Sequence, residues 1–193
     1  DHLDLPTLKL LAARGSETQF LVPLGNEALL RDQGIAQVRA FDWGDSMTIN
    51  GNTVYCLPTQ HWSKRGLTDT NRSLWASWAV IGANKRFYFA GDTGYFKGFQ
   101  AIGDKLGPFD LATMPIGAYE PTAMMQSSHM NPEEAVQAAI DVQAKKTLAI
   151  HFGTFDLSDE PLNEPPQRFK AAAAGDPGIE NAWVVKIGER REF

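Results

Sequence analysis

Three side chains that commonly bind metal ions stand at or just after the ends of short apolar segments in this sequence. The side chains are His61, Asp92 and His151, and the segments before them are 53–57, 86–90 and 147–150. Apolar runs of this length, bounded by turn residues, are typical of buried β-strands. In α/β proteins the carboxyl ends of strands form the crevice where ligands bind. The pattern therefore predicts an α/β fold that brings the three side chains together.

Helical and extended segments alternate along the rest of the chain. Asn50-Gly51 and the four residues 82–85 each separate two apolar runs and predict β-hairpins. Asn131, Pro132 and Glu134 fit a helix cap, the first helical residue and a capping-box partner. Further helices are expected from Pro6 and at 25–33, 132–144 and 164–174, and further strands at 18–22, 46–49, 73–81, 110–115 and 182–187. Hairpins mixed with strand–helix units predict one α/β domain with a mixed sheet over residues 1–193.

Charge and cysteine content limit the class of protein. The net charge of −5 argues against a general nucleic-acid-binding protein, which is normally basic. The single cysteine, Cys56, lies in an apolar run and is expected to be buried, in a protein of a reducing compartment. No apolar run approaches the roughly 20 residues that span a bilayer. We therefore expect a location in the cytoplasm or at a membrane surface, and a signal sequence would belong to a segment before residue 1.

The residue types at the strand ends indicate the kind of metal site. Imidazole and carboxylate groups suit zinc, iron or manganese, and the lack of cysteine ligands argues against a structural thiolate site. A carboxylate can bridge two cations, whereas a neutral imidazole cannot. Asp92 is therefore expected to bridge two divalent ions, with zinc as the expected metal, whose shared hydroxide would be the nucleophile.

Seven short motifs occur in a fixed order along the chain. Single motifs such as Gly-Asp-Thr-Gly occur in many proteins, but the ordered set is specific. The seven motifs are 1–4, 60–65, 74–78, 89–95, 115–121, 129–135 and 149–155. Together they resemble the metallo-β-lactamase superfamily, and more narrowly its N-acylphosphatidylethanolamine-hydrolysing phospholipase D group and bacterial relatives. The resemblance implies a four-layer αββα sandwich, of which this chain would hold the larger C-terminal part without the first sheet.

The resemblance also implies a set of metal ligands. Asp1, His2, Asp92 and His151 would hold one metal, and Asp1 would also act in catalysis. His61 and Asp92 would hold the other metal, together with two histidines of an H-x-H motif that would precede Asp1. Taken alone, Asp1-His2 could instead result from a cleavage site or be the remnant of a tag. We expect the absent N-terminal segment to belong to the parent chain or to come from another chain, and a homodimer is a further expected arrangement.

Candidate substrate contacts lie outside the ligand set. His129 precedes a helix N-terminus, where anions are favoured, so it is expected to contact a substrate phosphate or the leaving group; a loop hydrogen bond is the alternative. Lys64 and Arg65 follow a ligand loop and fit either phosphate binding or a solvated face. Met124 and Met125, near Tyr119, fit either a groove for an acyl chain or ordinary loop packing. The candidate substrate-binding residues are His129, Lys64, Arg65, Tyr119, Met124 and Met125.

These observations lead to one functional hypothesis and two rivals. The chain is expected to be a zinc-dependent phosphodiesterase of phospholipase D type, acting on N-acylphosphatidylethanolamine-like lipids or other phosphodiesters through a metal-bound hydroxide. The first rival is a lactonase or another hydrolase on the same scaffold. The second is a non-catalytic half-domain that needs a partner segment.

Overall fold

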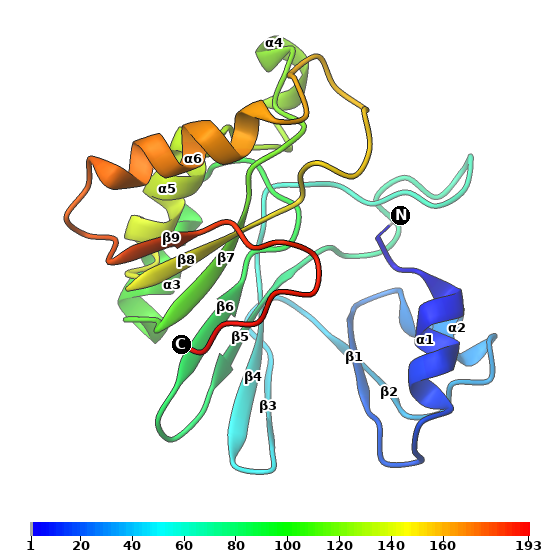
Figure 1. Ribbon diagram of the computed structural model, residues 1–193. Helices are drawn as coiled ribbons and strands as arrows, with labels where there is room; N and C mark the ends of the chain where they lie inside the picture. The colour runs from blue at the N-terminus through cyan, green and yellow to red at the C-terminus, as the bar shows by residue number, and fades with distance from the viewer. Residues whose placement is uncertain (1) are drawn as a thin grey trace.

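The computed structural model describes residues 2–193 and arranges its strands in two sheets (Figure 1). The strands are β1 (Phe20–Pro23), β2 (Val38–Phe41), β3 (Ser46–Ile49), β4 (Asn52–Leu57), β5 (Ser77–Ile81), β6 (Arg86–Phe89), β7 (Leu111–Pro115), β8 (Lys146–Ile150) and β9 (Asn181–Trp183). The helices are α1 (Leu5–Ala12), α2 (Glu27–Arg31), α3 (Gly98–Leu106), α4 (Thr122–Met125), α5 (Pro132–Asp141) and α6 (Glu164–Ala174). The predicted α/β class with a mixed sheet is confirmed.

The direction of the strands in the larger sheet decides where the candidate ligands meet. This sheet has the order β3-β4-β5-β6-β7-β8-β9. Strands β3 to β6 pair antiparallel, and β6 to β9 pair parallel. Consequently β4, β6, β7 and β8 all run in the same direction. Their carboxyl ends lie at one edge of the sheet, where connecting loops can share a site.

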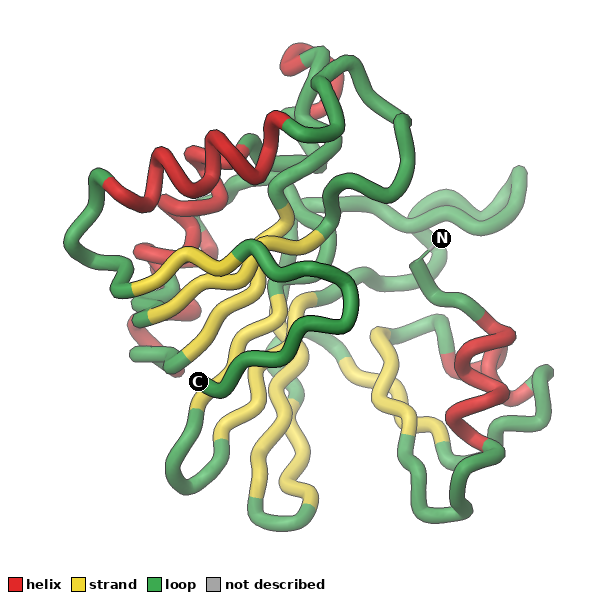
Figure 2. Tube along the Cα trace, in the orientation of Figure 1, coloured by secondary structure: helices red, strands yellow, loops and turns green. Residues whose placement is uncertain are grey.

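Helices α3, α5 and α6 cover one face of this sheet (Figure 2). The main core lies between them and contains Phe99 of α3, Phe169 of α6, and Tyr88 and Met114 from the sheet, all fully buried. Ala138 and Ala139 of α5 belong to the same core. The small side chains allow α5 to lie close to the sheet, so the helix layer fixes the strand ends beside it.

The opposite face of the sheet is contacted by the C-terminal segment. The ring of Phe193 lies 6.0 Å from that of Phe87, and Arg191 lies 5.5 Å from the ring of Trp183. Phe89 on this face remains 41% exposed. The parallel pair β1–β2 packs with α1 and α2 around its own small core beside the sheet. The expected absence of a first sheet from this sequence stays a prediction.

Local sequence signals for turns and helix ends are confirmed. Asn50 and Gly51 both have positive φ, 50° and 78°, and join β3 to β4 in the expected hairpin. Asn131 caps α5: its side chain accepts a hydrogen bond from the N–H of Glu134, and the Glu134 carboxylate accepts one from the N–H of Asn131. This capping box fixes where the chain enters α5, two residues after His129.

Some element boundaries differ from the predicted ones. Strand β5 begins at Ser77 and not at residue 73, because the N–H of Leu74 donates to the carbonyl of Leu24, directly after β1. Helix α5 ends at Asp141, before Gln143 adopts a positive φ of 60°. Helix α3 was not predicted, since its sequence contains two glycines. A Cβ on Gly103 would lie 2.2 Å from the carbonyl oxygen of Asp141, so close helix packing requires this glycine.

Candidate metal centre

Four histidines surround the carboxylate of Asp92. Oδ2 of Asp92 lies 3.3 Å from Nε2 of His2, 3.3 Å from Nε2 of His61 and 3.2 Å from Nε2 of His151. Its other oxygen, Oδ1, lies 3.4 Å from Nδ1 of His129. The ligand atoms form two groups with Asp92 in common: His2 and His151 in one, His61 and His129 in the other. The predicted convergence of residues distant in sequence is present among the described residues, and Asp1 lies outside them.

The parallel strand ends bring these side chains together, as expected from the sequence. His61 follows β4, Asp92 follows β6 and His151 follows β8 at once. His129 lies between β7 and α5. His151 has a φ of 58°, a left-handed conformation that is uncommon for a residue other than glycine. Such backbone strain is often kept where it aims a functional side chain.

Gln60 and Thr93 connect the loops that carry three of these ligands. The buried hydroxyl of Thr93 accepts a hydrogen bond from the N–H of Gln60 and donates one to the carbonyl of Gly94. The side-chain amide of Gln60 donates to the carbonyl of Ser127 at 3.1 Å. The loops of His61, Asp92 and His129 are thereby held to one another.

The hydrogen bond of His61 determines which ring nitrogen is available. Its Nδ1 lies 2.9 Å from the carbonyl oxygen of Trp62. A carbonyl oxygen only accepts, so Nδ1 carries the proton and donates. Nε2 then presents its lone pair toward Asp92. This tautomer is the one that ligates a metal, and the Trp62 carbonyl fixes the ring orientation. The Trp62 ring also stacks on that of His61, with 5.7 Å between centroids.

The distances between the candidate ligand atoms match those expected around a bound metal ion better than those of good hydrogen bonds. Two atoms that each lie about 2.0–2.1 Å from a tetrahedral ion are roughly 3.3–3.4 Å apart. The nitrogen–oxygen distances around Asp92 are 3.2–3.4 Å. Within residues 2–193, His61 Nε2, Asp92 Oδ1 and His129 Nδ1 are buried without a hydrogen-bond partner of good geometry. Buried polar atoms are rarely left unpaired, so their convergence supports a metal site.

The protonation equilibria follow from burial and from the shared carboxylate. Burial alone would raise the pKa of Asp92, but the imidazoles of His151, His2 and His61 outweigh it and hold that pKa far below its ordinary range. Burial lowers the pKa of His61 and of His151, yet contact with Asp92 raises both overall. For His129, burial dominates and the pKa is lowered. Asp92 is therefore ionised, as a bridging ligand must be.

The structure places the candidate substrate residues in different surroundings. Lys64 and Arg65 are exposed, and the Arg65 guanidinium donates to the carbonyl of Leu3 at 3.0 Å. Met124 is 74% exposed on α4, and Met125 is partly buried. Tyr119 is only 3% exposed, and its hydroxyl donates to Glu164 at 2.7 Å. The structure therefore does not bring Tyr119 to an open side of the site.

Three residues near the site were not identified from the sequence. Gln60 and Thr93 stand inside the recognised motifs, but nothing in the motifs shows that they bond to each other. Glu160 is 8% exposed and lies in an acidic loop after β8. Neighbouring acidic residues usually indicate a solvated loop, so its burial had no signal in the sequence.

Comparison of sequences gives consistent matches. The profile described as "Beta-lactamase superfamily domain" matches residues 1–152. The "N-acyl-phosphatidylethanolamine-hydrolyzing phospholipase D 1" of Caenorhabditis elegans is 45% identical over 181 residues, which are 88% of this chain and 51% of that protein. The "N-acyl-phosphatidylethanolamine-hydrolyzing phospholipase D, mitochondrial" of Saccharomyces cerevisiae is 34% identical over 200 residues, 100% of this chain and 42% of that protein. This chain thus spans about half the length of these relatives.

Comparison of structures gives the same fold. Igni18, a metallo hydrolase from Ignicoccus hospitalis, superposes with a TM-score of 0.71 at 23% identity, covering 95% of this chain and 71% of that one. An isothiocyanate hydrolase from Delia radicum gut bacteria superposes with a TM-score of 0.68 at 17% identity, covering 93% and 68%. At such identities the likeness concerns the fold alone.

Proposed function

Because this chain belongs to the beta-lactamase superfamily, we propose that it acts in a metal-dependent phosphodiesterase of phospholipase D type. The observation that carries the proposal is the arrangement of four histidines around the Asp92 carboxylate. The similarity to N-acyl-phosphatidylethanolamine-hydrolysing enzymes supports the choice of substrate. In this proposal an N-acylphosphatidylethanolamine-like lipid yields phosphatidic acid and an N-acylethanolamine.

The residues present fit two divalent ions, with zinc as the proposed metal. His2, Asp92 and His151 would hold one ion, and His61 and Asp92 would take part in holding the other. When bound, such ions supply positive charge for phosphoryl oxygens and lower the pKa of water. Asp92 belongs to both groups, so its ionised carboxylate would contribute a ligand to each of the two ions.

We propose a separate role for His129, as a contact to substrate. Burial keeps its imidazole in the neutral form, which can donate a hydrogen bond from one nitrogen and accept one at the other. The overall reaction joins the oxygen of water to phosphorus and breaks the phosphorus–oxygen bond to the leaving alcohol, which takes up one proton. His129 would stabilise a phosphoryl oxygen or the leaving oxygen during this exchange. Its place beside His61 and Asp92 makes metal ligation the competing role.

We further propose that the protein binds its substrate at a membrane surface. Residues 2–193 contain no helix with the length and apolarity needed to span a bilayer. Large apolar side chains are exposed on the segments that follow β7 and β8: Met124 on α4 is 74% exposed, and Phe155 and Leu157 in the loop after β8 are 72% and 80% exposed. Their segments lie at the upper end of Figure 1, where β7 and β8 end. Lys64 and Arg65 would add attraction to anionic headgroups.

A substrate panel separates this function from its rivals. The protein at its natural length should hydrolyse N-acylphosphatidylethanolamine in mixed vesicles, and loss of metal to a chelator should abolish that activity until zinc is restored. Lactones and simple carboxylic esters form the second arm. Turnover of lactones without phosphodiester cleavage would identify a lactonase. A protein that retains metal but turns over neither class would be a binding module.

A further inference from the structure

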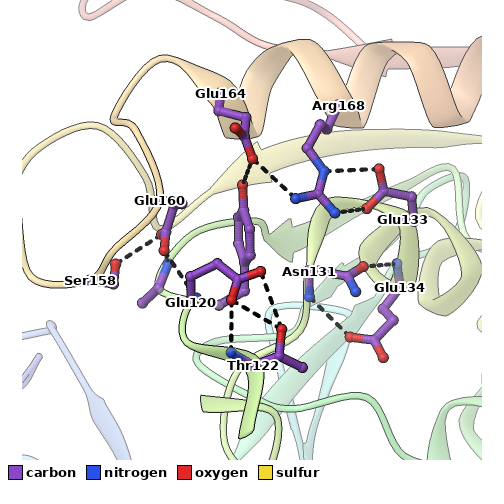
Figure 3. A network of polar contacts seen from close by, with 11 residues as sticks. Glu120, Thr122, Asn131, Glu133, Glu134, Ser158, Glu160, Glu164 and Arg168 are labelled. Carbon is purple, nitrogen blue, oxygen red and sulfur yellow. Dashed lines mark hydrogen bonds and ion pairs between the residues drawn. The ribbon is translucent and has the colours of Figure 1, made fainter. Parts of the chain in front are cut away.

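Glu160 is a carboxylate buried beside the candidate metal centre. Its Oε1 accepts hydrogen bonds from the N–H of Ala118 at 2.6 Å and from the hydroxyl of Ser158 at 2.9 Å. Its Oε2 accepts one from the N–H of Glu120 at 3.1 Å. Figure 3 shows this carboxylate pointing from the loop after β8 toward the loop after β7. All three bonds join the two loops or stiffen the one that carries Glu160.

The segment 117–120 donates two N–H groups to Glu160 and contacts the backbone of His151. The N–H of Asp159 donates to the carbonyl of Glu120 at 3.1 Å. Glu120 is therefore bonded to the loop after β8 through both its N–H and its carbonyl. A Cβ on Gly117 would lie 2.4 Å from the carbonyl oxygen of His151, so the two backbones are in close contact there. The loop after His151 is thus bonded, through Glu160, to the segment 117–120, whose backbone at Gly117 contacts that of His151.

The same loop continues to His129 through a series of hydrogen bonds. The carboxylate of Glu120 accepts a bond from the N–H of Thr122 at 2.8 Å, at the first residue of α4. At the other end of α4, the carbonyl of Met125 accepts one from the N–H of His129 at 2.8 Å. A shift of Glu120 would therefore move α4 and, with it, the backbone of His129.

The charge of Glu160 is unusual for its position. Ion pairs within residues 2–193 do not include Glu160, and its partners are neutral N–H and O–H groups. A buried charge without a countercharge is costly unless something compensates it. The neighbouring Arg168 does not do so, since it pairs with Glu133 and Glu164 (Figure 3). The positive charge of bound metal ions would be the compensation in the proposed function.

We propose that Glu160 is a positioning residue for the metal centre: its carboxylate fixes the loop 117–120 and so aims both His151 and His129 at Asp92. The inference rests on the proposed function, because it assumes that the centre holds metal. Residues that orient metal ligands without touching the ion typically change metal affinity or activity by 10–100-fold when replaced.

The test uses Glu160→Gln in the protein at its natural length, loaded with Co²⁺ as a spectroscopic probe. Glutamine keeps the size of the side chain but has one acceptor oxygen, so it loses at least one of the two backbone bonds and the charge. We expect its retention of Co²⁺ against a chelator to weaken by about 10–100-fold, with a changed visible spectrum. Ser158→Ala keeps the charge and removes one bond, and should shift both readouts less. Glu180→Gln, at an exposed carboxylate away from the site, is the matched control.

Three outcomes decide the inference. A Glu160→Gln protein that melts at a lower temperature but keeps the affinity and spectrum of the parent would show a merely structural role and overturn it. If Glu160→Gln does not fold, an unchanged spectrum in Ser158→Ala would overturn it as well. A parent protein that binds no Co²⁺ would refute the proposed metal-dependent function itself, and the inference with it.

Discussion

Oδ2 of Asp92 lies 3.2 Å from Nε2 of His151, although strand β7 separates the strands that precede these two residues. The same oxygen lies 3.3 Å from Nε2 of His61. One carboxylate thus contacts imidazoles from both candidate metal groups. The site therefore depends on this residue more than on any one histidine.

Replacing Asp92 by asparagine should remove nearly all metal from both positions. Asparagine keeps the shape of the side chain but not the charge, and a neutral amide is a poor bridge between cations. Turnover should fall by at least about 10²-fold, since the loss of mere support for a ligand already costs 10–100-fold. Metal content per chain, measured by plasma mass spectrometry, checks this, with a substitution at the exposed Asp104 of α3, Asp104→Asn, as the control. Full metal content with retained activity would refute the bridging role.

His129→Ala should lower turnover on the order of 10²-fold while the metal content stays unchanged. The reason is that His129 is proposed to contact the substrate and not the metal. Both quantities should be measured on the same preparation. Loss of metal in proportion to activity would instead identify His129 as a ligand, a role compatible with its 3.4 Å separation from Asp92 Oδ1.

Asn131→Ala should destabilise the fold by about 1 kcal/mol, because it removes the side-chain cap of α5. Asn163 stands at the equivalent position of α6 but makes no capping bond with its side chain. Asn163→Ala is therefore a matched control, expected to have a smaller effect. Urea unfolding of both variants measures the difference, and equal destabilisation would contradict the role of the capping box.

Asp110 should make stability depend on pH in the acid range. Burial alone would raise its pKa, but the N–H of Arg86 and the ammonium group of Lys145 outweigh it and hold the pKa below its ordinary value of 3.8. A carboxyl whose pKa is depressed by folding stabilises the fold above its unfolded pKa and loses that contribution as the pH falls through the folded one. The free energy of unfolding of Asp110→Asn should therefore decrease less than that of the parent from about pH 5 downward. Parallel curves for both proteins would contradict this.

The sequence predicted the parts of the fold that local chemistry determines. Asn50-Gly51 adopts positive φ as its turn requires, and Asn131 caps α5 as its spacing from Glu134 indicated. By contrast, α3 contains Gly98 and Gly103 and has a weak local preference for helix. It forms because tertiary packing against the end of α5 overrides that preference, and a single sequence does not reveal this contact.

Three of the candidate metal ligands, His61, Asp92 and His151, could be predicted because each follows an apolar strand. His2 follows no strand and was expected only from the resemblance to a known family. The residues that support these ligands could not be predicted from the sequence. Glu160 resembles the other acidic residues of its loop, and only the folded chain brings it to Ala118. Tyr119 was expected at the substrate, but its hydroxyl is directed to Glu164 inside the molecule. Such roles depend on contacts between distant segments, which spacing along the chain does not encode.

Anomalous diffraction at the zinc absorption edge, from crystals of the protein at its natural length, tests the central claim most directly. The account predicts two peaks on either side of the Asp92 carboxylate, one contacting His2 and His151 and the other contacting His61. Ligand distances should be about 2.0–2.2 Å. Crystals grown with zinc that show no anomalous peak within coordination distance of Asp92 would contradict the account.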